Sequence, residues 1–578
     1  MYKAPVEEIS FTLEAVAGLD AARDAGALGD LSPEDVTAIL SEAARFAEEV
    51  LAPLNAAGDR HHPTLADGAV TTSPGWVDAY AAWVEAGWSS LTGDPAHGGQ
   101  GLPMALQIAL TDIWNQANAA FSLNPLLTIS AVEALEAHGS DALKATYLEN
   151  LISGRWTGTM NLTEPQSGSD LGDLKTRAEP AGDGTYRLFG QKIYITYGEH
   201  DLTENIIHFV LARLPDAPAG TRGISLFLVP KVMVGDDGSL GARNDVVCAG
   251  LEGKLGINAS PTCTMVYGAA GAGAVGWLVG EPHKGLSAMF TMMNNARVSV
   301  GMQGAAVAER AFQQALAYAN ERKQGRGPSG SAMVAIVQHA DVKRMLLSMA
   351  TLTKAARAIC YGCAVAIDRG RTDPFWKKRA DLLTPLAKAF ATDVGVEVAS
   401  LGVQVHGGMG FIEEAGAAQH YRDARIFPIY EGTNGIQAMD LVRRKITMDD
   451  GAVLSAYLDE LRETVEAARA ANAPDLSGVA PALEMAIDAV AEAASTLRAA
   501  VADDPSRAFA GATPFLRALG LTAGGAALTK AALAGGTAGR ATLARAFAET
   551  QLCLVPALAQ SATRGDTVAA MDPAVLAA

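Results

Sequence analysis

The chain has 578 residues, of which 49% are hydrophobic and 19% are charged. It is therefore long enough for more than one folded domain and too apolar to be intrinsically disordered. Asp and Glu number 63 against 45 Lys and Arg, a formal net charge of −18, which argues against a general nucleic-acid-binding protein because such proteins need a basic face.

The five cysteines are too few for a disulfide framework in a chain of this length. Cys360 and Cys363 form a C-x-x-C pair inside an Ala-rich helical pattern, with no second Cys pair or His nearby. We interpret them as buried thiols, and we expect no metal site.

The start of the sequence lacks the basic and apolar regions of a signal peptide. The most apolar late stretch, residues 515–532, is broken by Arg517, several glycines and Lys530, and no uninterrupted apolar run reaches the length of a membrane span. We therefore expect a cytoplasmic protein without an integral membrane segment.

Residues 1–155 are predicted to be helical. Ser32 and Pro33, followed by two acids, are typical of a helix start. Residues 61–75 are polar and contain Gly and Pro, which predicts a surface loop. A glycine-rich turn follows at residues 95–103, where we expect His97 to be structural. Helices then resume and run, with breaks, to Leu151.

From Trp156 to about residue 280, short β-branched and aromatic runs alternate with Gly, Asp and Pro clusters, which predicts an antiparallel β domain. Residues 271–276 fit the G-x-G-x-x-G spacing of a dinucleotide fingerprint, but the next residues are typical of a strand and not of the helix that the fingerprint requires. We interpret them as a glycine-rich hairpin loop. The strands that we expect lie at residues 186–189, 193–196, 206–211, 224–229 and 263–267.

Helical periodicity returns after residue 280. We expect long helices at residues 285–324, 332–369 and 374–401, the last broken near Pro385. In the last part of the chain, apolar residues from Leu454 to Val465 share one face, and breaks fall near Pro505 and Pro514. The predicted fold is mainly α with a central antiparallel β domain. Its predicted parts are an N-terminal helical domain at 1–155, the β domain at 156–280, a helical bundle at 281–445 and an extra helical domain at 446–578.

Glu431 lies on a predicted bend between apolar neighbours. Gly432, the next residue, permits backbone conformations that other residues rarely adopt, and Thr433 or Asn434 can cap the apolar helix that follows. Partial desolvation there would raise the pKa of Glu431 towards the range that a general base needs. The alternative is an ordinary loop acid that precedes a helix start.

Two motifs resemble those of one enzyme family. Tyr430-Glu431-Gly432-Thr433, preceded by Arg422-Asp423-Ala424-Arg425 and followed by Ile436-Gln437, resembles the catalytic-base segment of the acyl-CoA dehydrogenases. Residues 163–170, Thr-Glu-Pro-Gln-Ser-Gly-Ser-Asp, resemble the T-E-P-x-A-G-S-D signature of that family, with Ser167 where Ala is usual. The similarity runs in order from about residue 35 to about residue 445. The chain length resembles the longer branch of the family, which has a further helical tail.

The resemblance implies α,β-dehydrogenation of an acyl-CoA thioester to the trans-2-enoyl-CoA. Glu431 would remove the α proton while the β hydride passes to N5 of FAD, and electrons would leave to an electron-transfer flavoprotein. The developing enolate oxygen needs preorganised donors, which in the family are the backbone N–H of the catalytic Glu and a flavin ribityl hydroxyl. If Glu431 were not the base, Glu164 would be the next carboxylate to consider.

The resemblance also implies binding roles, residue by residue. Thr163 would bond the isoalloxazine, Tyr194 would cover the flavin face in place of the usual Trp, and Thr196 would bond N5 or O4. The cofactor-binding residues implied in this way are Met160, Leu162, Thr163, Ser169, Tyr194, Thr196, Arg322, Gln404, Gly407, Gly408 and Thr433. The substrate-binding residues implied are Ser169, Asn294, Arg297 and Gly432.

Some of these positions depart from the family pattern, since Asn294 replaces the more usual Asp and Gly325 stands where a Phe commonly follows Arg322. Arg322 would reach the FAD pyrophosphate of a neighbouring subunit, and residues 404–410 would contact the adenosine part, where we expect His406 to do no chemistry. A cofactor bound across subunits requires at least a dimer. We expect a homodimer, because the extra helical domain would cover the surface where two dimers would otherwise meet.

Two other functions share parts of this pattern. An acyl-CoA oxidase that uses oxygen has the same fold and the same Glu, and the sequence does not show solvent access to the flavin. A non-catalytic acyl-CoA-binding protein is the alternative from another class, but the intact Glu431 and both flavin segments argue against it. Among substrates we expect short or sulfur-containing acyl-CoAs such as 3-methylmercaptopropionyl-CoA, from overall similarity and not from any pocket residue.

Overall fold

The computed structural model describes residues 2–235, 237–327, 330, 332–535 and 538–577. The chain forms two compact units. The first comprises Met1–Arg45, Met104–Gln116 and Arg297–Ala578, and the second comprises Phe46–Pro103 and Ala117–Ala296. Helices α6 (Met104–His138) and α8 (Gly285–Glu321) each contribute residues to both units.

Helix α6 confirms the predicted breaks in the N-terminal helical region. Its backbone leaves helical geometry at Asn118, with φ −159° and ψ 93°. The Asn118 side chain caps the continuing helix, because its Oδ1 accepts a hydrogen bond from the backbone N–H of Phe121 at 3.1 Å.

The loop predicted at residues 61–75 is wrong in part. It contains a small antiparallel hairpin of β1 (Thr64–Ala66) and β2 (Ala69–Thr71). The turn between them is Asp67-Gly68, with φ of 51° and 76°. Asp-Gly is a favoured pair for such a tight turn, because both residues tolerate positive φ.

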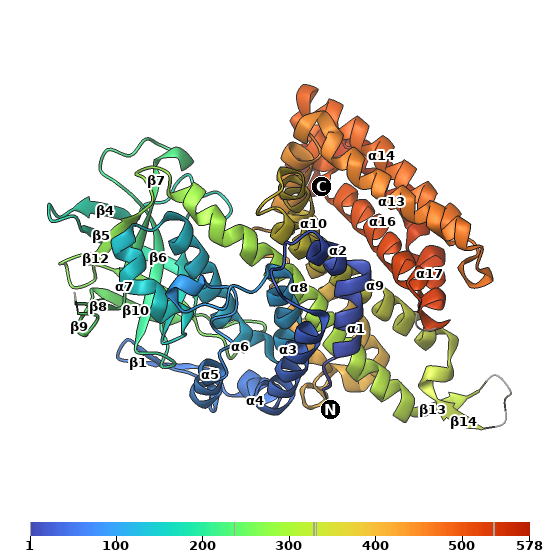
Figure 1. Ribbon diagram of the computed structural model, residues 1–578, viewed down its shortest axis with the longest axis horizontal. Coiled ribbons are helices and arrows are strands. Elements are labelled where there is room, and N and C mark those ends of the chain that lie inside the picture. The colour runs from blue at the N-terminus through green and yellow to red at the C-terminus, as the bar shows by residue number, and fades with distance from the viewer. Residues whose placement is uncertain (1, 236, 328–329, 331, 536–537, 578) are drawn as a thin grey trace. The chain divides into compact units, whose positions relative to one another are not determined.

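The second unit is built on an eight-stranded sheet, shown in Figure 1. The strand order is β10-β11-β5-β12-β7-β6-β3, and β4 pairs with β5 and β6. The strands are β3 (Trp156–Asn161), β4 (Arg177–Pro180), β5 (Tyr186–Thr196), β6 (Asn205–Arg213), β7 (Ile224–Pro230), β10 (Val246–Leu251), β11 (Thr262–Tyr267) and β12 (Ala274–Val279).

Most neighbouring strands are antiparallel, as predicted, and two of the predicted strands form the single strand β5. The prediction is wrong for β6, which pairs in parallel with β3 and, at one position, with β4. A parallel pair needs a long connection, and the β4–β5 segment supplies one between β3 and β6. The glycine-rich loop predicted at residues 271–276 is right in part: residues 271–273 lie in the loop before β12, residues 274–276 already belong to that strand, and no helix follows, as predicted.

Strand β6 of this sheet is buried on both faces. Along β6, Ile207, Phe209 and Leu211 belong to one apolar cluster, with residues of α6, α7 (Asp141–Ile152) and the start of α8. The alternating residues Val210 and Ala212 belong to the cluster on the opposite face. Successive side chains of a strand point to opposite faces, so β6 is packed from both sides. The remaining elements of the second unit include α4 (Ala52–Arg60), α5 (Trp76–Glu85) and the strands β8 (Val232–Val234) and β9 (Leu240–Arg243).

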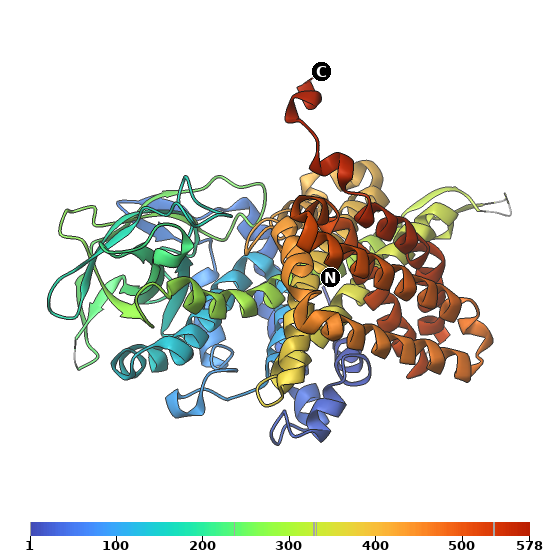
Figure 2. The same ribbon diagram turned by 90° about the horizontal axis from the view of Figure 1, so that it is seen from above.

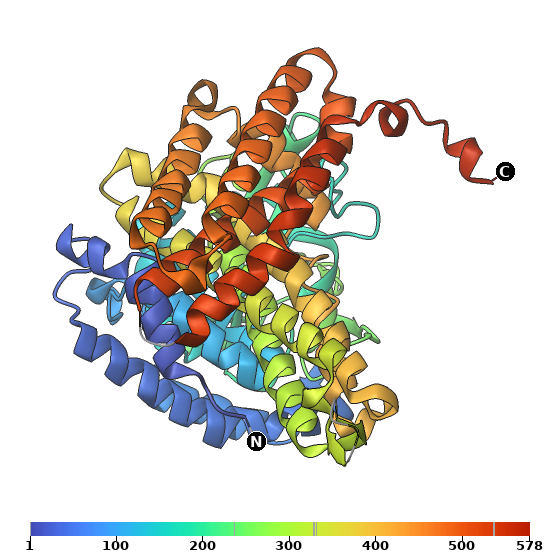
Figure 3. The ribbon, with the colours of Figure 1, turned by 90° about the vertical axis from the view of Figure 1, so that its right-hand side faces the viewer.

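The first unit consists mainly of helices. Helix α16 packs against α9 and α10 at glycines: a Cβ at Gly520 would lie 2.3 Å from the Phe390 ring, and one at Gly524 would lie 2.6 Å from the Cβ of Ala355. Figures 2 and 3 show the orange and red helices α13 to α18 side by side. The other helices of this unit are α1 (Val6–Phe11), α2 (Leu19–Asp24), α3 (Pro33–Phe46, of which Phe46 belongs to the second unit), α9 (Ala340–Arg369), α10 (Pro374–His406), α11 (Ala417–Ala424), α12 (Asn434–Asp440), α13 (Ala452–Ala471), α14 (Val479–Asp503), α15 (Pro505–Ala510), α16 (Ala512–Leu533), α17 (Ala538–Thr550), α18 (Val555–Thr563) and α19 (Asp566–Ala569).

Two helix predictions in this unit are wrong. Helix α10 continues through Pro385, which is buried within it, because tertiary packing against α9 outweighs the local cost of a proline. The apolar run after residue 332 begins with strand β14 (Met333–Ala335), which pairs with β13 (Lys323–Arg326). Short apolar runs do not distinguish strand from helix by periodicity.

The thiols of Cys360 and Cys363 are buried, as predicted, and their Sγ atoms lie 3.8 and 3.9 Å from the carbonyl oxygens of Ala387 and Ala380. In the described ranges, no helix is long and apolar enough to cross a membrane. Among the same residues, no cluster of three His, Cys, Asp or Glu side chains is arranged to hold a metal ion.

Candidate active site

Glu431 lies in a strained turn of the first unit, between α11 and α12. Its φ is 53°, a left-handed conformation that few residues other than glycine adopt, and Gly432 follows with φ 82°. Thr433 caps α12, because its Oγ1 accepts a hydrogen bond from the backbone N–H of Ile436 at 3.3 Å. Of the two predicted capping residues, Thr433 is therefore the one that acts.

The buried ammonium group of Lys388, on α10, holds both ends of this turn. Its Nζ donates to the carbonyl oxygen of Phe427 and to Oδ1 of Asn434, each at 2.9 Å. Asn434 Nδ2 in turn donates to Oδ1 of Asp393 at 2.7 Å and to Oγ1 of Thr392 at 2.9 Å. The turn is thus fastened to one rigid helix, which fixes the position of the Glu431 backbone.

A second set of contacts fixes the residue before Glu431. The Tyr430 hydroxyl donates to Oε1 of Gln303, on α8. Gln303 Nε2 donates to Oδ1 of Asn115, on α6, at 3.0 Å, and both side chains are buried. These partners could not be predicted from the sequence, because Gln303 lies 127 residues from Tyr430 and 188 from Asn115.

Burial and nearby positive charges act in opposite directions on the pKa of Glu431. Burial raises the pKa of Glu431, while Arg297 and Lys388 pull that pKa down. The direction of the net shift agrees with the prediction for a general base. Burial also lowers the pKa of Lys388 to about 7, against the attraction of Glu431 and Asp393. Both groups of this pair therefore have pKa values displaced towards neutrality, as is common at functional sites.

In the second unit, Glu164 is a structural anchor. Its Oε1 accepts hydrogen bonds from Lys192 Nζ at 2.8 Å and from Thr176 Oγ1 at 2.6 Å, and its Oε2 accepts from the backbone N–H of Lys175 at 2.7 Å. Burial alone would raise the pKa of Glu164, but Lys192 and the other donors lower it to about 2. A carboxylate with this pKa is a poor proton acceptor, so Glu164 is not suited to replace Glu431 as the base.

The Glu164–Lys192 pair also ties the Thr163 segment to strand β5. Lys192 Nζ donates to the carbonyl oxygen of Leu162 at 3.0 Å. The backbone N–H of Ile193 donates to the carbonyl oxygen of Thr163 at 2.9 Å. Thr163 and the β5 residues from Lys192 onward are therefore held together.

Tyr194 lies at an irregularity of β5. The pairing with β11 shifts between Cys263 and Met265, and Tyr194 has φ 62° with 61% of its surface exposed. Bulges redirect a side chain and are frequent beside active sites. Two residues later, the carbonyl oxygen of Thr196 accepts a hydrogen bond from Thr159 Oγ1 at 2.7 Å. The bulge thus exposes the aromatic ring of Tyr194 on strand β5.

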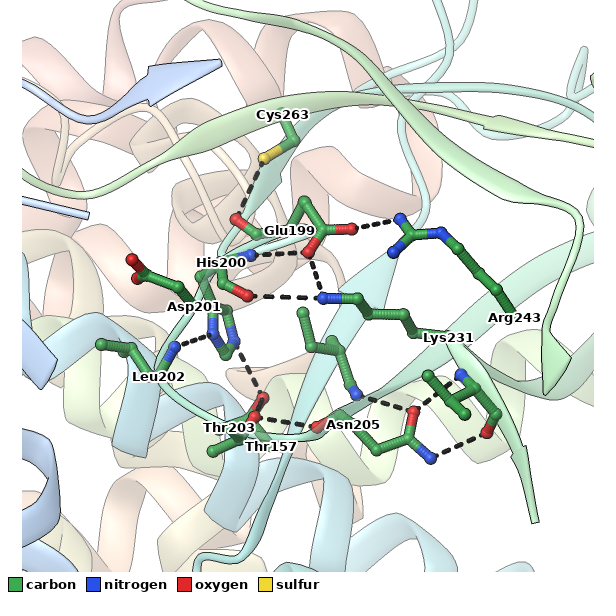
Figure 4. A network of polar contacts seen from close by, with 12 residues as sticks. Thr157, Glu199, His200, Asp201, Leu202, Thr203, Asn205, Lys231, Arg243 and Cys263 are labelled. Carbon is green, nitrogen blue, oxygen red and sulfur yellow. Dashed lines mark hydrogen bonds and ion pairs between the residues drawn. The ribbon is translucent and has the colours of Figure 1, made fainter. Parts of the chain in front are cut away.

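The chain after β5 is held by a buried carboxylate that the sequence did not reveal (Figure 4). Glu199 forms ion pairs with Lys231 and with Arg243, the latter at 2.7 Å. His200 Nε2 lies 2.9 Å from Thr157 Oγ1. These partners come from β3, from β9 and from the residue between β7 and β8, so the network fixes the segment that follows Thr196 against three other parts of the unit.

The remaining predicted residues fall into separate groups. Met160 is buried and Leu162 half-buried in the core of the second unit, where Ser169 and Asn294 are exposed. In the first unit, Arg297 lies beside the Glu431 turn, since a Cβ at Gly432 would be 3.8 Å from its Nη2.

Arg322 and the segment at residues 404–410, called the Gln404 turn below, form another group in the first unit. The backbone N–H of Arg322 donates to Tyr318, whose ring stacks on His406 at 4.4 Å between centroids. His406 is buried, and its Nδ1 lies 2.7 Å from the Gly402 carbonyl oxygen; that His406 does no chemistry stays a prediction. Arg322, Gln404, Gly407 and Gly408 are exposed, and a Cβ at either glycine would meet nothing within 4 Å. This backbone is open to a close-fitting ligand such as the adenosine part of a dinucleotide.

Known protein families match almost the whole chain. Residues 33–155 match the family "Acyl-CoA dehydrogenase, N-terminal domain". Residues 159–269 match the family's middle domain, and residues 283–446 match its C-terminal domain. The description "Acetyl-CoA dehydrogenase C-terminal like" matches residues 457–572.

Individual relatives agree with this. The chain is 47% identical to 3-methylmercaptopropionyl-CoA dehydrogenase of Ruegeria pomeroyi, over 92% of this chain and 91% of that protein. It is 35% identical to a butyryl-CoA dehydrogenase of Syntrophomonas wolfei, over 74% and 73%. Two solved structures share the fold: Caenorhabditis elegans ACDH-11 in complex with C11-CoA (TM-score 0.80, 20% identity, 96% and 93% covered) and a Bacillus anthracis acyl-CoA dehydrogenase complexed with FAD (TM-score 0.75, 21% identity, 100% and 94% covered).

Proposed function

Because the chain belongs to the acyl-CoA dehydrogenase family, whose members are FAD-dependent oxidoreductases, we propose that it desaturates an acyl-CoA between Cα and Cβ with Glu431 as the base. The observation that carries this proposal is the Glu431 turn. A carboxylate in a left-handed turn has its pKa raised by burial and lies in the field of Arg297 and Lys388.

The residues of the chain supply proton transfer and position. Glu431 accepts the α proton of the thioester. The backbone N–H of Glu431 donates to the thioester oxygen as negative charge develops there, an interaction that strengthens in the transition state. Lys388 and Gln303 keep the turn from relaxing, so the carboxylate meets the α carbon without reorganisation. FAD, held by Thr163, Tyr194 and Thr196 at its isoalloxazine, would supply the acceptor for the β hydride.

The flavin segments fit this cofactor. The exposed Tyr194 ring offers an aromatic surface for the isoalloxazine, and Thr163 and Thr196 lie on the two chain segments that Lys192 ties together. The open backbone at Gly407 and Gly408, with Arg322 and Thr433, suits the adenosine and pyrophosphate parts.

The substrate that we propose is 3-methylmercaptopropionyl-CoA or another short acyl-CoA, with Ser169, Asn294, Arg297 and Gly432 on its CoA and thioester parts. The support is the 47% identity to the Ruegeria pomeroyi enzyme of that name. Flavin bleaching by a panel of acyl-CoAs tests this directly. A clear preference for long acyl chains would contradict it.

The change Glu431→Gln tests the base. Gln is nearly isosteric, so FAD content and acyl-CoA binding should survive, while bleaching of the flavin by substrate should slow by about 10²–10⁴-fold. Glu414→Gln is the matched control, because Glu414 is an exposed carboxylate of the same unit. Bleaching by Glu431→Gln within a few-fold of Glu414→Gln would exclude Glu431 as the base.

We also propose that electrons leave to an electron-transfer flavoprotein and not to oxygen. The support is family membership, since the relatives are named as dehydrogenases. Substrate-reduced enzyme should reoxidise rapidly with that flavoprotein and slowly in air. Rapid production of hydrogen peroxide in air would favour the oxidase alternative.

A homodimer is the assembly that we propose. Beside the Gln404 turn lie three exposed apolar side chains: Met409 is 50% exposed, Phe411 85% and Ile412 45%. Exposed apolar patches of this kind commonly mark interfaces. Light scattering should therefore give the mass of two chains, and the mass of one or of four chains would contradict the proposal.

A further inference from the structure

A small pocket lies inside the first unit, remote in sequence from the Glu431 turn. Its volume is about 90 Å³, and its walls come from the helices α9, α10, α13 and α16 and from the N-terminal segment around Val16. Most of the residues that line it are apolar, including Leu383, Leu461 and Ala523. The charged residues at its wall are Arg379, Glu460 and Lys530.

These three charges are arranged around a shared carboxylate. Arg379 Nη1 donates to Glu460 Oε2 at 2.6 Å, and Lys530 Nζ donates to Glu460 Oε1 at 3.2 Å. Burial alone would raise the pKa of Glu460, but Lys530 and Arg379 lower it, so Glu460 is ionised near neutral pH. Two cations against one carboxylate leave one net positive charge at the pocket wall, which favours an anionic ligand.

Arg379 has donor capacity that its neighbours do not use. Its surface is only 3% exposed, and its Nε has no hydrogen-bond partner among the residues that the structure describes. The guanidinium lies over the Tyr457 ring, 4.7 Å from the ring centroid, and Tyr457 also lines the pocket. A buried guanidinium whose charge is only partly compensated is costly, and an anion in the pocket would lower that cost through its charge.

Gly362 shows that the space beside α9 is open. It lies in the interior of this helix and lines the pocket, and a Cβ built on it would meet nothing within 4 Å. Glycine within a helix is unfavourable relative to alanine, and here no neighbouring atom excludes a side chain. The missing side chain enlarges the pocket where its wall is apolar.

Because one water needs roughly 10–15 Å³ of such volume, the pocket accommodates about six non-hydrogen atoms. From this size, the net positive charge, the buried Arg379 guanidinium and the apolar lining residues, we propose that the pocket binds a short aliphatic monocarboxylate. Its carboxylate accepts from Lys530 Nζ and lies in the field of the Arg379 guanidinium, and its alkyl chain lies towards Gly362. Such a ligand would join α13 and α16 to α10, independently of the proposed dehydrogenation.

Isothermal titration of the FAD-loaded protein with sodium butyrate, at constant ionic strength, tests this proposal. One butyrate should bind per chain, and 1-butanol, which has the same carbon chain without the charge, should give no binding. Gly362→Leu fills the pocket and keeps its charges, and Lys530→Met removes one cation. Lys530→Met should weaken butyrate binding about tenfold or more, because a hydrogen bond to a charged group is worth at least that factor. Gly362→Leu should weaken it at least as much, because the added side chain occupies the space of the alkyl chain.

Lys377→Met is the matched control, since Lys377 is exposed on α10, two residues before Arg379. It should leave butyrate affinity unchanged. Absence of butyrate binding, equal binding of 1-butanol, or wild-type affinity in both pocket variants would each overturn the proposal. Butyrate that bound at the flavin instead would perturb the flavin spectrum and would survive Gly362→Leu. Acyl-CoA oxidation by the same variants is measured separately, so failure of this proposal and failure of the dehydrogenase proposal are distinguishable.

Discussion

The change Gly432→Ala should slow catalysis although it removes no charged or hydrogen-bonding side chain. Gly432 has φ 82°, and a Cβ there would lie 2.6 Å from Nε2 of Gln437. Gln437 is buried, and its Nε2 lies 3.5 Å from the carbonyl oxygen of Glu431, at the limit of hydrogen bonding. The added methyl group therefore strains the backbone and displaces the neighbour that supports the Glu431 turn.

The size of the effect follows from these two costs. A left-handed conformation costs a residue with a Cβ about 1–2 kcal/mol, and the loss of a typical hydrogen bond costs about 0.5–1.5 kcal/mol. Together they disfavour the present turn by about 2–3 kcal/mol relative to relaxed alternatives. Since 1.4 kcal/mol is a factor of about ten, the productive conformation should become about 30–150 times rarer.

Gly435→Ala provides the same chemical change three residues later. Gly435 lies in the first turn of α12, is exposed, and has only Thr433 Oγ1, at 3.9 Å, near its built Cβ. This substitution should leave the rate unchanged and should stabilise α12 slightly, because alanine favours a helix.

Stopped-flow measurement of flavin reduction at saturating acyl-CoA compares the two variants. Both should contain FAD. If Gly432→Ala reduced its flavin as fast as Gly435→Ala, the left-handed geometry of the Glu431 turn would have no bearing on the chemistry, and the turn would be an ordinary loop.

Two further predictions concern buried charged groups. Lys388 lowers the pKa of Glu431, so Lys388→Met should raise that pKa and move the acid limb of the flavin-reduction rate to higher pH, because only the deprotonated carboxylate accepts a proton; an unchanged or downward-shifted pH profile would contradict this. Glu164 has a pKa of about 2 against 4.5 ordinarily, so its stabilising effect is complete above pH 4.5 and is lost as the pH falls towards 2. Lys192→Met should lower the free energy of unfolding at pH 7 by about 3–5 kcal/mol. Denaturant unfolding at pH 7 and pH 4 measures this loss and its pH dependence. If wild type and variant lost the same free energy of unfolding on acidification, the Glu164–Lys192 pair would not be the cause.

The features that the sequence predicted well depend on local chemistry. The change at Trp156 from helical periodicity to short β-branched and aromatic runs indicated the β domain, because such runs pack well within a sheet. The bend at Glu431 was predicted from Gly432 and a capping residue, both of which act within three residues of the turn.

The features that the sequence did not predict depend on distant partners. Pro385 indicates a break by its own chemistry, but packing against α9 keeps α10 continuous. Lys388 looks like an ordinary helical lysine, and only the fold brings its Nζ to Phe427, 39 residues away. Glu199 likewise meets Lys231 and Arg243 only after the sheet has formed.

The Glu164–Lys192 pair has a consequence for how β5 finds its place during folding. Sliding β5 by one residue against its neighbours would turn every side chain to the opposite face. Lys192 would then leave Glu164, and a buried carboxylate without its cation is strongly unfavourable. We therefore expect the ion pair to disfavour folded states in which β5 is out of register. Correct register also positions the Tyr194 bulge. The buried ion pair that aligns β5 therefore also determines the position of the exposed Tyr194 ring.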